Sequence, residues 1–464
     1  MRTKQACPVS GAGQNLWFEH ALLPEGWKRG VRLTLESGCL AKIEPATEKR
    51  SGDDAHSVAV PGMPNLHSHA FQRGMAGLAE MRGPSDDSFW TWRELMYRFV
   101  ARLGPDQFEA IAAMAFAEML EAGFTRVGEF HYLHRDVDGA PYADHAEMAA
   151  RVAAAAAETG IGLTLLPVFY AHSGFGGLAP NPAQRRFLHD VDGFASLLEA
   201  SRKAVSGLED AIVGVAPHSL RAVTKEELVK VEQLAGRAPI HIHVAEQVKE
   251  VEDCFAWSGK RPVQWLLDTG LVDERWCLVH ATHIDGQEME ALAESGAVAG
   301  LCPITEANLG DGVFPAAAFA HGGGRFGIGS DSNVMIDAAE ELRLLEYGQR
   351  LIHRSRNAMA RAQGSSTGGD LYRTALAGGA QALGAGDGAI RVGASADLVS
   401  MDLNHTAMSG RNGDAILDSW IFAARGGAVE CVWRHGRKVV SQGRHIAREK
   451  IAARYRATLS ALLG

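Results

Sequence analysis

The stretch Pro61-Gly62-Met63-Pro64-Asn65-Leu66-His67-Ser68-His69 has the character of a buried strand that ends on two histidines. In an extended chain, alternate residues point to the same side, so His67 and His69 face one point while Ser68 turns away. Two imidazoles placed in this way can bind a metal ion, but an isolated His-x-His pair also fits two ordinary histidines at a strand end. The rest of the chain has to separate these two interpretations.

After Pro61, strand-like apolar runs alternate with amphipathic stretches such as 105–122 and 225–234, which is the pattern of βα units around a parallel sheet. The strand candidates are 63–66, 125–131, 163–169, 212–217, 240–246, 277–282, 297–303 and 325–330. Eight such units predict a distorted, closed (β/α)8 barrel of the TIM type. A doubly wound sheet would require a Gly-x-Gly-x-x-Gly turn after an early strand, and the sequence has none there.

Short β-type runs lie on both sides of this region in the sequence. They are 16–22, 31–35, 39–43 and 57–60 before it, and 397–402, 430–434 and 437–440 after it. Neither set is large enough to be stable alone, so we expect both to form one composite β-sandwich domain. The predicted division is 1–60 for its N-terminal part, 61–385 for the barrel, and 386–464 for its C-terminal part with a terminal helix over 446–463.

The composition excludes several kinds of partner. The net charge is −9 and no basic block is present, which argues against binding to nucleic acid or to an anionic membrane surface. No apolar run is long enough to span a membrane. The six cysteines are scattered without a Cys-x-x-Cys pair, which argues against a disulfide framework and a thiolate zinc site. We therefore expect a cytoplasmic protein with a small-molecule partner.

Histidines and carboxylates stand at the predicted carboxyl ends of the barrel strands, where the catalytic groups of such barrels gather. They are His67, His69, Glu129, His131, His218, His243, Glu246, His280 and Asp331. Three imidazoles and a carboxylate suit Zn²⁺ or Fe²⁺ with one position left for water, whose pKa such an ion lowers toward ~7. Glu246 and Asp331 would then pass a proton to a leaving nitrogen, while His280 steadies the water or the tetrahedral centre.

Two of these site positions have a second candidate histidine nearby in the sequence. A regular strand turns His241 and His243 to the same side, and we favour His243 because Glu246 follows it closely. His283 competes with His280, which lies nearer to the apolar run of its strand. We expect Glu129 and His131 to be polar residues of a strand end that do not touch the metal.

Taken together, these motifs resemble the amidohydrolase superfamily over nearly the whole chain. The matching segments are Pro61-Gly62-x-x-Asn65-x-His67-x-His69, His243-Val244-Ala245-Glu246, Val279-His280-Ala281, Gly329-Ser330-Asp331 and 393–399. The resemblance implies one zinc ion held by the positions of His67, His69, His243 and Asp331. The His-x-x-Glu pair is similar to the deaminase branch, which uses one metal and no carboxylated lysine.

Three further segments, 65–77, 88–98 and 305–312, resemble the formimidoylglutamate deiminases within that branch. This implies hydrolysis of N-formimidoyl-L-glutamate to N-formyl-L-glutamate and ammonia in histidine degradation, by a homodimer. Gln72, Arg93, Tyr132, His218 and Arg221 match the positions that the family would use to bind this substrate.

The substrate is an amidine with two carboxylates, and arginine pairs bidentately with carboxylate. A deaminase of a purine, pterin or triazine ring is the alternative, and it would depend on aromatic stacking instead. A barrel kept only as a non-catalytic scaffold is a remote alternative, because every expected ligand and both acid–base candidates are present.

Overall fold

The His-x-His segment forms the first strand of a parallel barrel in the computed structural model, which describes residues 13–82 and 89–464. One half of the ring contains β5 (Met63–Ser68), β6 (Phe124–His131), β7 (Gly162–Phe169), β8 (Ile212–Val213) and β9 (Ala216–Pro217). The other half contains β10 (Ile240–Val244), β11 (Trp276–His280), β12 (Val298–Leu301) and β13 (Arg325–Ile328). Parallel bridges from Ser68 to Asp331 and from Val215 to Ile240 join the halves. The predicted barrel is confirmed.

The fourth strand is the irregular one. The predicted run 212–217 divides into β8 and β9, which both pair with β7, and Gly214 lies between them. A Cβ at Gly214 would lie 2.5 Å from the carbonyl oxygen of Pro239, so glycine permits this close approach to the start of the next strand.

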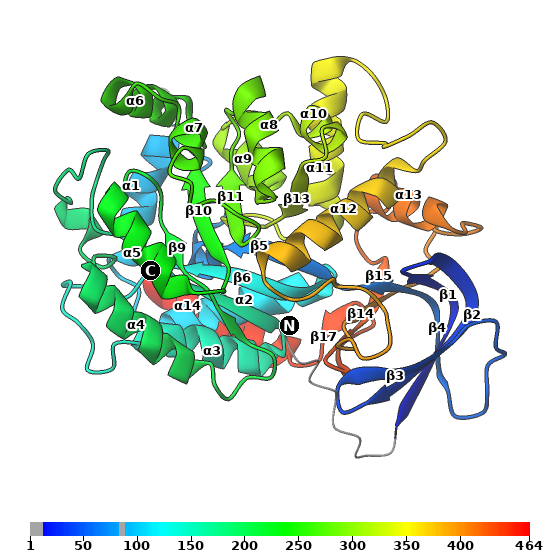
Figure 1. Cartoon of the computed structure of the whole chain (residues 1–464). Coiled ribbons are helices and arrows are strands. Elements are labelled where there is room, and N and C mark those ends of the chain that lie inside the picture. Colours follow the sequence, from blue (N-terminus) through cyan, green and yellow to red (C-terminus); the bar gives the residue numbers. More distant parts are fainter. Residues whose placement is uncertain (1–12, 83–88) are drawn as a thin grey trace.

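Helices surround the barrel and the mouth of the barrel at the carboxyl ends of its strands (Figure 1). They are α1 (Phe89–Val100), α2 (Pro105–Glu121), α3 (Glu147–Thr159), α4 (Val191–Ala204), α5 (Lys225–Ala235), α6 (Val248–Ser258), α7 (Pro262–Leu267), α8 (Gly286–Ser295), α9 (Pro303–Leu309), α10 (Ala316–His321), α11 (Ala338–His353) and α12 (Thr367–Ala382), with short 3₁₀ turns at η1 (Ala70–Met75) and η2 (Pro182–Gln184). Helix α2 shows why they form: Pro105 occupies its first turn, and Phe108, Ile111 and Phe116 are buried.

The chain ends combine in one mixed sheet, whose strand order is β17-β16-β15-β14-β4-β1-β2-β3. The N-terminal strands are β1 (Gln14–Leu23), β2 (Gly26–Glu36), β3 (Cys39–Glu44) and β4 (Asp54–Pro61); the C-terminal ones are β14 (Leu398–Met401), β15 (Val429–Arg434), β16 (Arg437–Ser441) and β17 (Arg444–His445). β4 and β14 pair antiparallel, so the expected composite β domain is confirmed, with its strands in one eight-stranded path. The exact boundaries at residues 60 and 385 stay predictions.

The composite sheet is tied closely to the first barrel strand. Only Gly62 separates β4 from β5, and a Cβ there would lie 2.1 Å from the Thr125 side chain. Helix α13 (Asp414–Phe422) lies between β14 and β15 in the chain, and the terminal helix α14 (Arg448–Leu463) packs on α2 (Figure 1). Residues from both ends of the chain therefore support the strand that carries His67 and His69.

Two expectations from composition have structural outcomes. Cys254, Cys277, Cys302 and Cys431 are buried free thiols, whereas Cys39 is disulfide-bonded, so the sequence argument against disulfide bonds does not hold for Cys39. Among the helices of the described residues, none has the length and apolar character needed to cross a membrane.

Candidate metal centre and active site

Four buried side chains meet at the carboxyl end of the barrel. The Nε2 atom of His67 lies 3.3 Å from that of His69 and 3.0 Å from that of His243. Asp331 Oδ1 lies 3.4 Å from His67 Nε2 and 3.3 Å from His69 Nε2. These residues come from the first, fifth and eighth strands, so closure of the barrel brings together groups that are far apart in the sequence.

Backbone contacts hold these groups in place. The Nδ1 of His69 donates to the carbonyl of Phe130 at 3.0 Å, and the Nδ1 of His243 donates to that of His218 at 2.9 Å. Both imidazoles therefore direct the Nε2 lone pair into the site. Asp331 adopts a left-handed backbone with φ 40°, and its amide donates to the carbonyl of His67 at 3.0 Å. Gly329 allows this approach, because a Cβ there would lie 2.9 Å from that of His67.

The chemistry of these donors fits a divalent cation. Burial lowers the pKa of His67 to about 3, so protons on the histidines do not supply the positive charge that balances Asp331. Several nitrogen lone pairs and a carboxylate that face one another within about 3.5 Å repel each other unless a cation lies between them. Three imidazoles and one carboxylate are a ligand set suited to zinc in a catalytic site.

Two further groups lie beside the four. His280 Nε2 is 3.9 Å from Glu246 Oε1 and 3.8 Å from Asp331 Oδ2. Burial raises the pKa of Glu246 to about 7. Burial alone would lower the pKa of His280, but Glu246, Glu306 and Asp331 together raise it to about 10. The pair thus combines a carboxyl that titrates near neutrality with an imidazolium that can donate from Nε2.

Glu246 reaches the site in a way that the strand pattern did not predict. The predicted strand 240–246 ends at Val244, and Ala245 takes a left-handed conformation with φ 52°. In a regular strand, a residue three positions after His243 would face the opposite side. The turn at Ala245 instead brings Glu246 to the side of His243.

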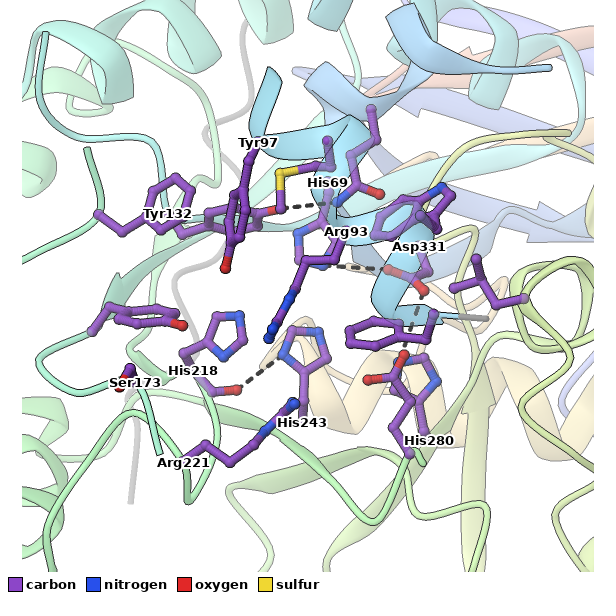
Figure 2. Close-up of a pocket in the computed structure, with 18 residues that line it drawn as sticks. His69, Arg93, Tyr97, Tyr132, Ser173, His218, Arg221, His243, His280 and Asp331 are labelled. Atoms are coloured by element: carbon purple, nitrogen blue, oxygen red, sulfur yellow. Dashed lines mark hydrogen bonds and ion pairs between the residues drawn. The ribbon is translucent and has the colours of Figure 1, made fainter. Parts of the chain in front are cut away.

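These groups form the floor of a solvent-connected cavity (Figure 2). All the predicted site residues line it except His67, which lies beneath His69 and His243. Gln72 donates from Nε2 to the Tyr132 hydroxyl at 2.9 Å. Figure 2 shows Arg93 and Arg221 extending from opposite sides toward the region of His243.

The two arginines have an unusual environment. The Arg93 guanidinium lies 4.6 Å from the Trp90 ring centroid, and that of Arg221 lies 5.8 Å from it. Among residues 13–82 and 89–464, no carboxylate forms an ion pair with either guanidinium. Two guanidiniums near one aromatic ring, neither of them in such an ion pair, create a site that attracts anions.

The rival residues lie elsewhere. The Nε2 of His241 donates to the carbonyl of Ala382 at 2.8 Å, deeper in the barrel. His283 and His131 do not line the cavity, and the His131 ring packs against Phe108 and His134. Glu129 accepts a hydrogen bond from the Ala70 amide at 2.8 Å. The geometry therefore favours His243 and His280 over their rivals.

The sequence interpretation gave no role to several residues near the site. The cavity is also lined by Phe89, Trp92, Met96, Tyr97, Tyr170, Ser173, Phe187 and Leu309. Glu306 contacts His280 from behind. Tyr97 and Glu306 fall in the segments 88–98 and 305–312, whose resemblance to a family was the one signal that pointed to them.

The buried carboxyl of Glu129 leads to a prediction about stability. Burial raises its pKa from 4.5 to about 8, so the folded state binds its proton more tightly than the unfolded state. The stabilisation of the folded state by protonated Glu129 is complete below pH 4.5 and is lost as pH rises toward 8. The free energy of unfolding of Glu129→Gln should therefore rise relative to that of wild type by up to about 1.4 kcal/mol per pH unit across this window. Urea unfolding at pH 6 and pH 9 measures it, and an equal difference at both pH values would contradict it.

Family comparisons agree with this geometry. Residues 58–439 match the amidohydrolase family, and residues 16–57 match the N-terminal domain of formimidoylglutamate deiminase HutF. The first match covers the barrel, and the second covers most of the N-terminal strands of the composite sheet.

Individual relatives differ in their degree of similarity. The formimidoylglutamate deiminase of Pseudomonas aeruginosa is 52% identical over 97% of this chain and 99% of its own. A 5-methylthioadenosine/S-adenosylhomocysteine deaminase of Natronomonas pharaonis is 29% identical over 79% of this chain and 78% of its own. The ring-deaminase relative is thus the more distant of the two.

Solved structures give the same order. An amidohydrolase from Brucella melitensis superposes with a TM-score of 0.95 at 56% identity, covering 97% of this chain and 100% of its own. A zinc-bound adenosine deaminase from Xanthomonas campestris gives 0.80 at 23% identity over 98% and 100%, which supports the fold alone. The chain belongs to the amidohydrolase family and, within it, to the formimidoylglutamate deiminases.

Proposed function

We propose that this protein is a zinc-dependent deiminase that converts N-formimidoyl-L-glutamate and water to N-formyl-L-glutamate and ammonia in histidine degradation. The observation that carries the proposal is the pair Arg93 and Arg221, which face the cavity without a carboxylate partner among the described residues. A substrate with two carboxylates supplies the missing anions. The 52% identity to a formimidoylglutamate deiminase supports the same assignment.

His67, His69, His243 and Asp331 would hold the metal. A divalent ion bound there supplies Lewis acidity and lowers the pKa of water toward ~7. Fe²⁺ is the alternative ion for this ligand set. A chelator should abolish activity, and readdition of Zn²⁺ or Fe²⁺ under anaerobic conditions would identify the ion that restores it.

The side chains of the protein carry out the proton transfers and bind the substrate. Glu246 takes a proton from the attacking water as the oxygen bonds to the amidine carbon, and delivers it to the imino nitrogen. His280 hydrogen-bonds the tetrahedral centre through Nε2. Asp331 takes the hydroxyl proton and passes it to the amino group, which leaves as ammonia while the C=O bond forms. Gln72, Tyr132 and His218 orient the amidine, and the two arginines hold the carboxylates.

A purine or other ring deaminase is the second candidate, because Trp92, Tyr97, Tyr170 and Phe187 give the cavity aromatic walls. Two guanidiniums without a carboxylate partner argue against an uncharged ring. Ammonia release should be measured with N-formimidoyl-L-glutamate, guanine and 5-methylthioadenosine. Turnover of a purine alone would contradict the proposal, and full metal loading without turnover of any substrate would favour a scaffold.

The arginines lead to a prediction about affinity. Arg93→Met and Arg221→Met should each raise KM for N-formimidoyl-L-glutamate about 10- to 100-fold, because a hydrogen bond to a charged group contributes about 1.5–3 kcal/mol. The kcat should change less. Arg98→Met is the matched control, since Arg98 is exposed on the same helix and does not line the cavity. An unchanged KM in both cavity variants would remove the dicarboxylate assignment.

Location and assembly complete the proposal. We propose a cytoplasmic enzyme, because four of the described cysteines are buried free thiols, although Cys39 is disulfide-bonded. We also propose a homodimer, as the family resemblance suggests. Analytical ultracentrifugation of the purified protein tests the assembly state, and a monomer at micromolar concentration would contradict it.

A further inference from the structure

We propose that Glu306 is a positioning residue that fixes the ring orientation and the Nδ1 proton of His280. The Nδ1 of His280 lies 3.3 Å from Glu306 Oε1. Both side chains are buried, with 1% of His280 and 4% of Glu306 exposed. The inference rests on the role of His280 in the proposed function, and it assigns the group that acts behind that histidine.

The Glu306 carboxylate is itself held in place. Its Oε1 accepts a hydrogen bond from the Cys302 amide at 2.9 Å, at the start of α9. Asp311 donates its amide to the Glu306 carbonyl at 2.9 Å. A carboxylate fixed at its own helix has little freedom to follow a moving imidazole, so it can define where the ring points.

Capping of α9 does not explain this arrangement completely. A second buried carboxylate, Glu341 of α11, accepts a hydrogen bond from the Ile304 amide of the same first turn at 2.9 Å. Glu341 forms no hydrogen bond or ion pair with His280 among the described residues. The two carboxylates share the capping task, and only Glu306 also contacts the imidazole.

The opposite edge of the imidazole faces the reaction site. Its Nε2 lies 3.9 Å from Glu246 Oε1 and 3.8 Å from Asp331 Oδ2. The backbone of His280 is left-handed with φ 67°, so the residue does not continue the regular geometry of β11. A carboxylate that accepts from Nδ1 selects the ring orientation in which Nε2 faces the substrate, as in other carboxylate–histidine pairs.

Glu306→Gln is the first test. The amide oxygen can still accept from Cys302, but the negative charge opposite Nδ1 is lost. We expect kcat to fall about 100-fold or more, with KM changed less than about threefold and full metal content. Glu341→Gln is the matched control, because it makes the same substitution at another buried carboxyl that accepts a hydrogen bond from the same helix start; its kcat should stay within about threefold of wild type. Equal losses of kcat in the two variants would overturn the proposal.

Two further measurements separate positioning from a structural role. Glu306→Asp retains the charge and should recover part of the kcat that Gln loses. With ¹⁵N-labelled histidine, wild type should show a low-field Nδ1–H proton resonance that disappears in both Glu306→Gln and His280→Asn. Its absence from wild type would overturn the proposal even if Glu306→Gln does not fold. The resonance requires no substrate, so this result is independent of whether N-formimidoyl-L-glutamate is the substrate.

Discussion

Glu246→Gln is expected to lower kcat by about 10²- to 10⁴-fold, the range that a positioned general acid–base group contributes. Gln cannot take a proton from water, whereas the burial that raises the pKa of Glu246 to about 7 prepares the carboxyl to exchange protons near neutrality. Metal content should stay at the wild-type level, because Glu246 is not one of the four side chains that converge on the metal position. Steady-state kinetics and elemental analysis of the same preparation measure both quantities.

Glu129→Gln is the matched control for this variant. It makes the same substitution at another buried carboxyl, on β6, that does not line the cavity. Its kcat at pH 7 should stay within about threefold of wild type. If Glu246→Gln retains kcat within tenfold of wild type at full metal content, the general-base assignment is wrong.

Asp331→Asn is expected to cause the largest combined loss of metal affinity and kcat. Asp331 Oδ1 lies 3.3–3.4 Å from the imidazoles of His67 and His69, and Oδ2 lies 3.8 Å from His280 Nε2. Replacing a residue that hydrogen-bonds a metal ligand commonly weakens metal binding about 10- to 100-fold. Loss of a charged ligand itself should weaken it at least as much. Asn tolerates a positive φ, which preserves the local backbone.

Zinc titration with a competing chelator measures the affinity of the Asp331→Asn variant, and kcat is then determined at saturating zinc. We expect kcat to stay at least about 100-fold below wild type even when the metal is restored, because the proton transfer is also lost. Asp311→Asn is the control: Asp311 is buried and hydrogen-bonded by Gln247 but does not line the cavity. Wild-type zinc affinity in Asp331→Asn would exclude it as a ligand.

Much of the fold could be predicted because strand and helix periodicities are local. The runs 125–131 and 325–330 lie within one or two residues of β6 and β13, and helix 105–122 differs from α2 by one residue. The prediction was least accurate where the backbone departs from regular geometry. The split of 212–217 into β8 and β9 depends on contacts with β7 and with Pro239, which the segment itself does not encode.

The sequence by itself determined which side chains stand at the strand ends, since alternation along a strand sets the direction of His67, His69 and His243. Tertiary structure decided how these side chains meet other groups. The left-handed turn at Ala245 directs Glu246, and α9 brings Glu306 behind His280. Arg93 and Arg221 approach one cavity from α1 and from the loop after β9. Closure of the barrel fixes these relations, because they depend on contacts between segments far apart in the chain.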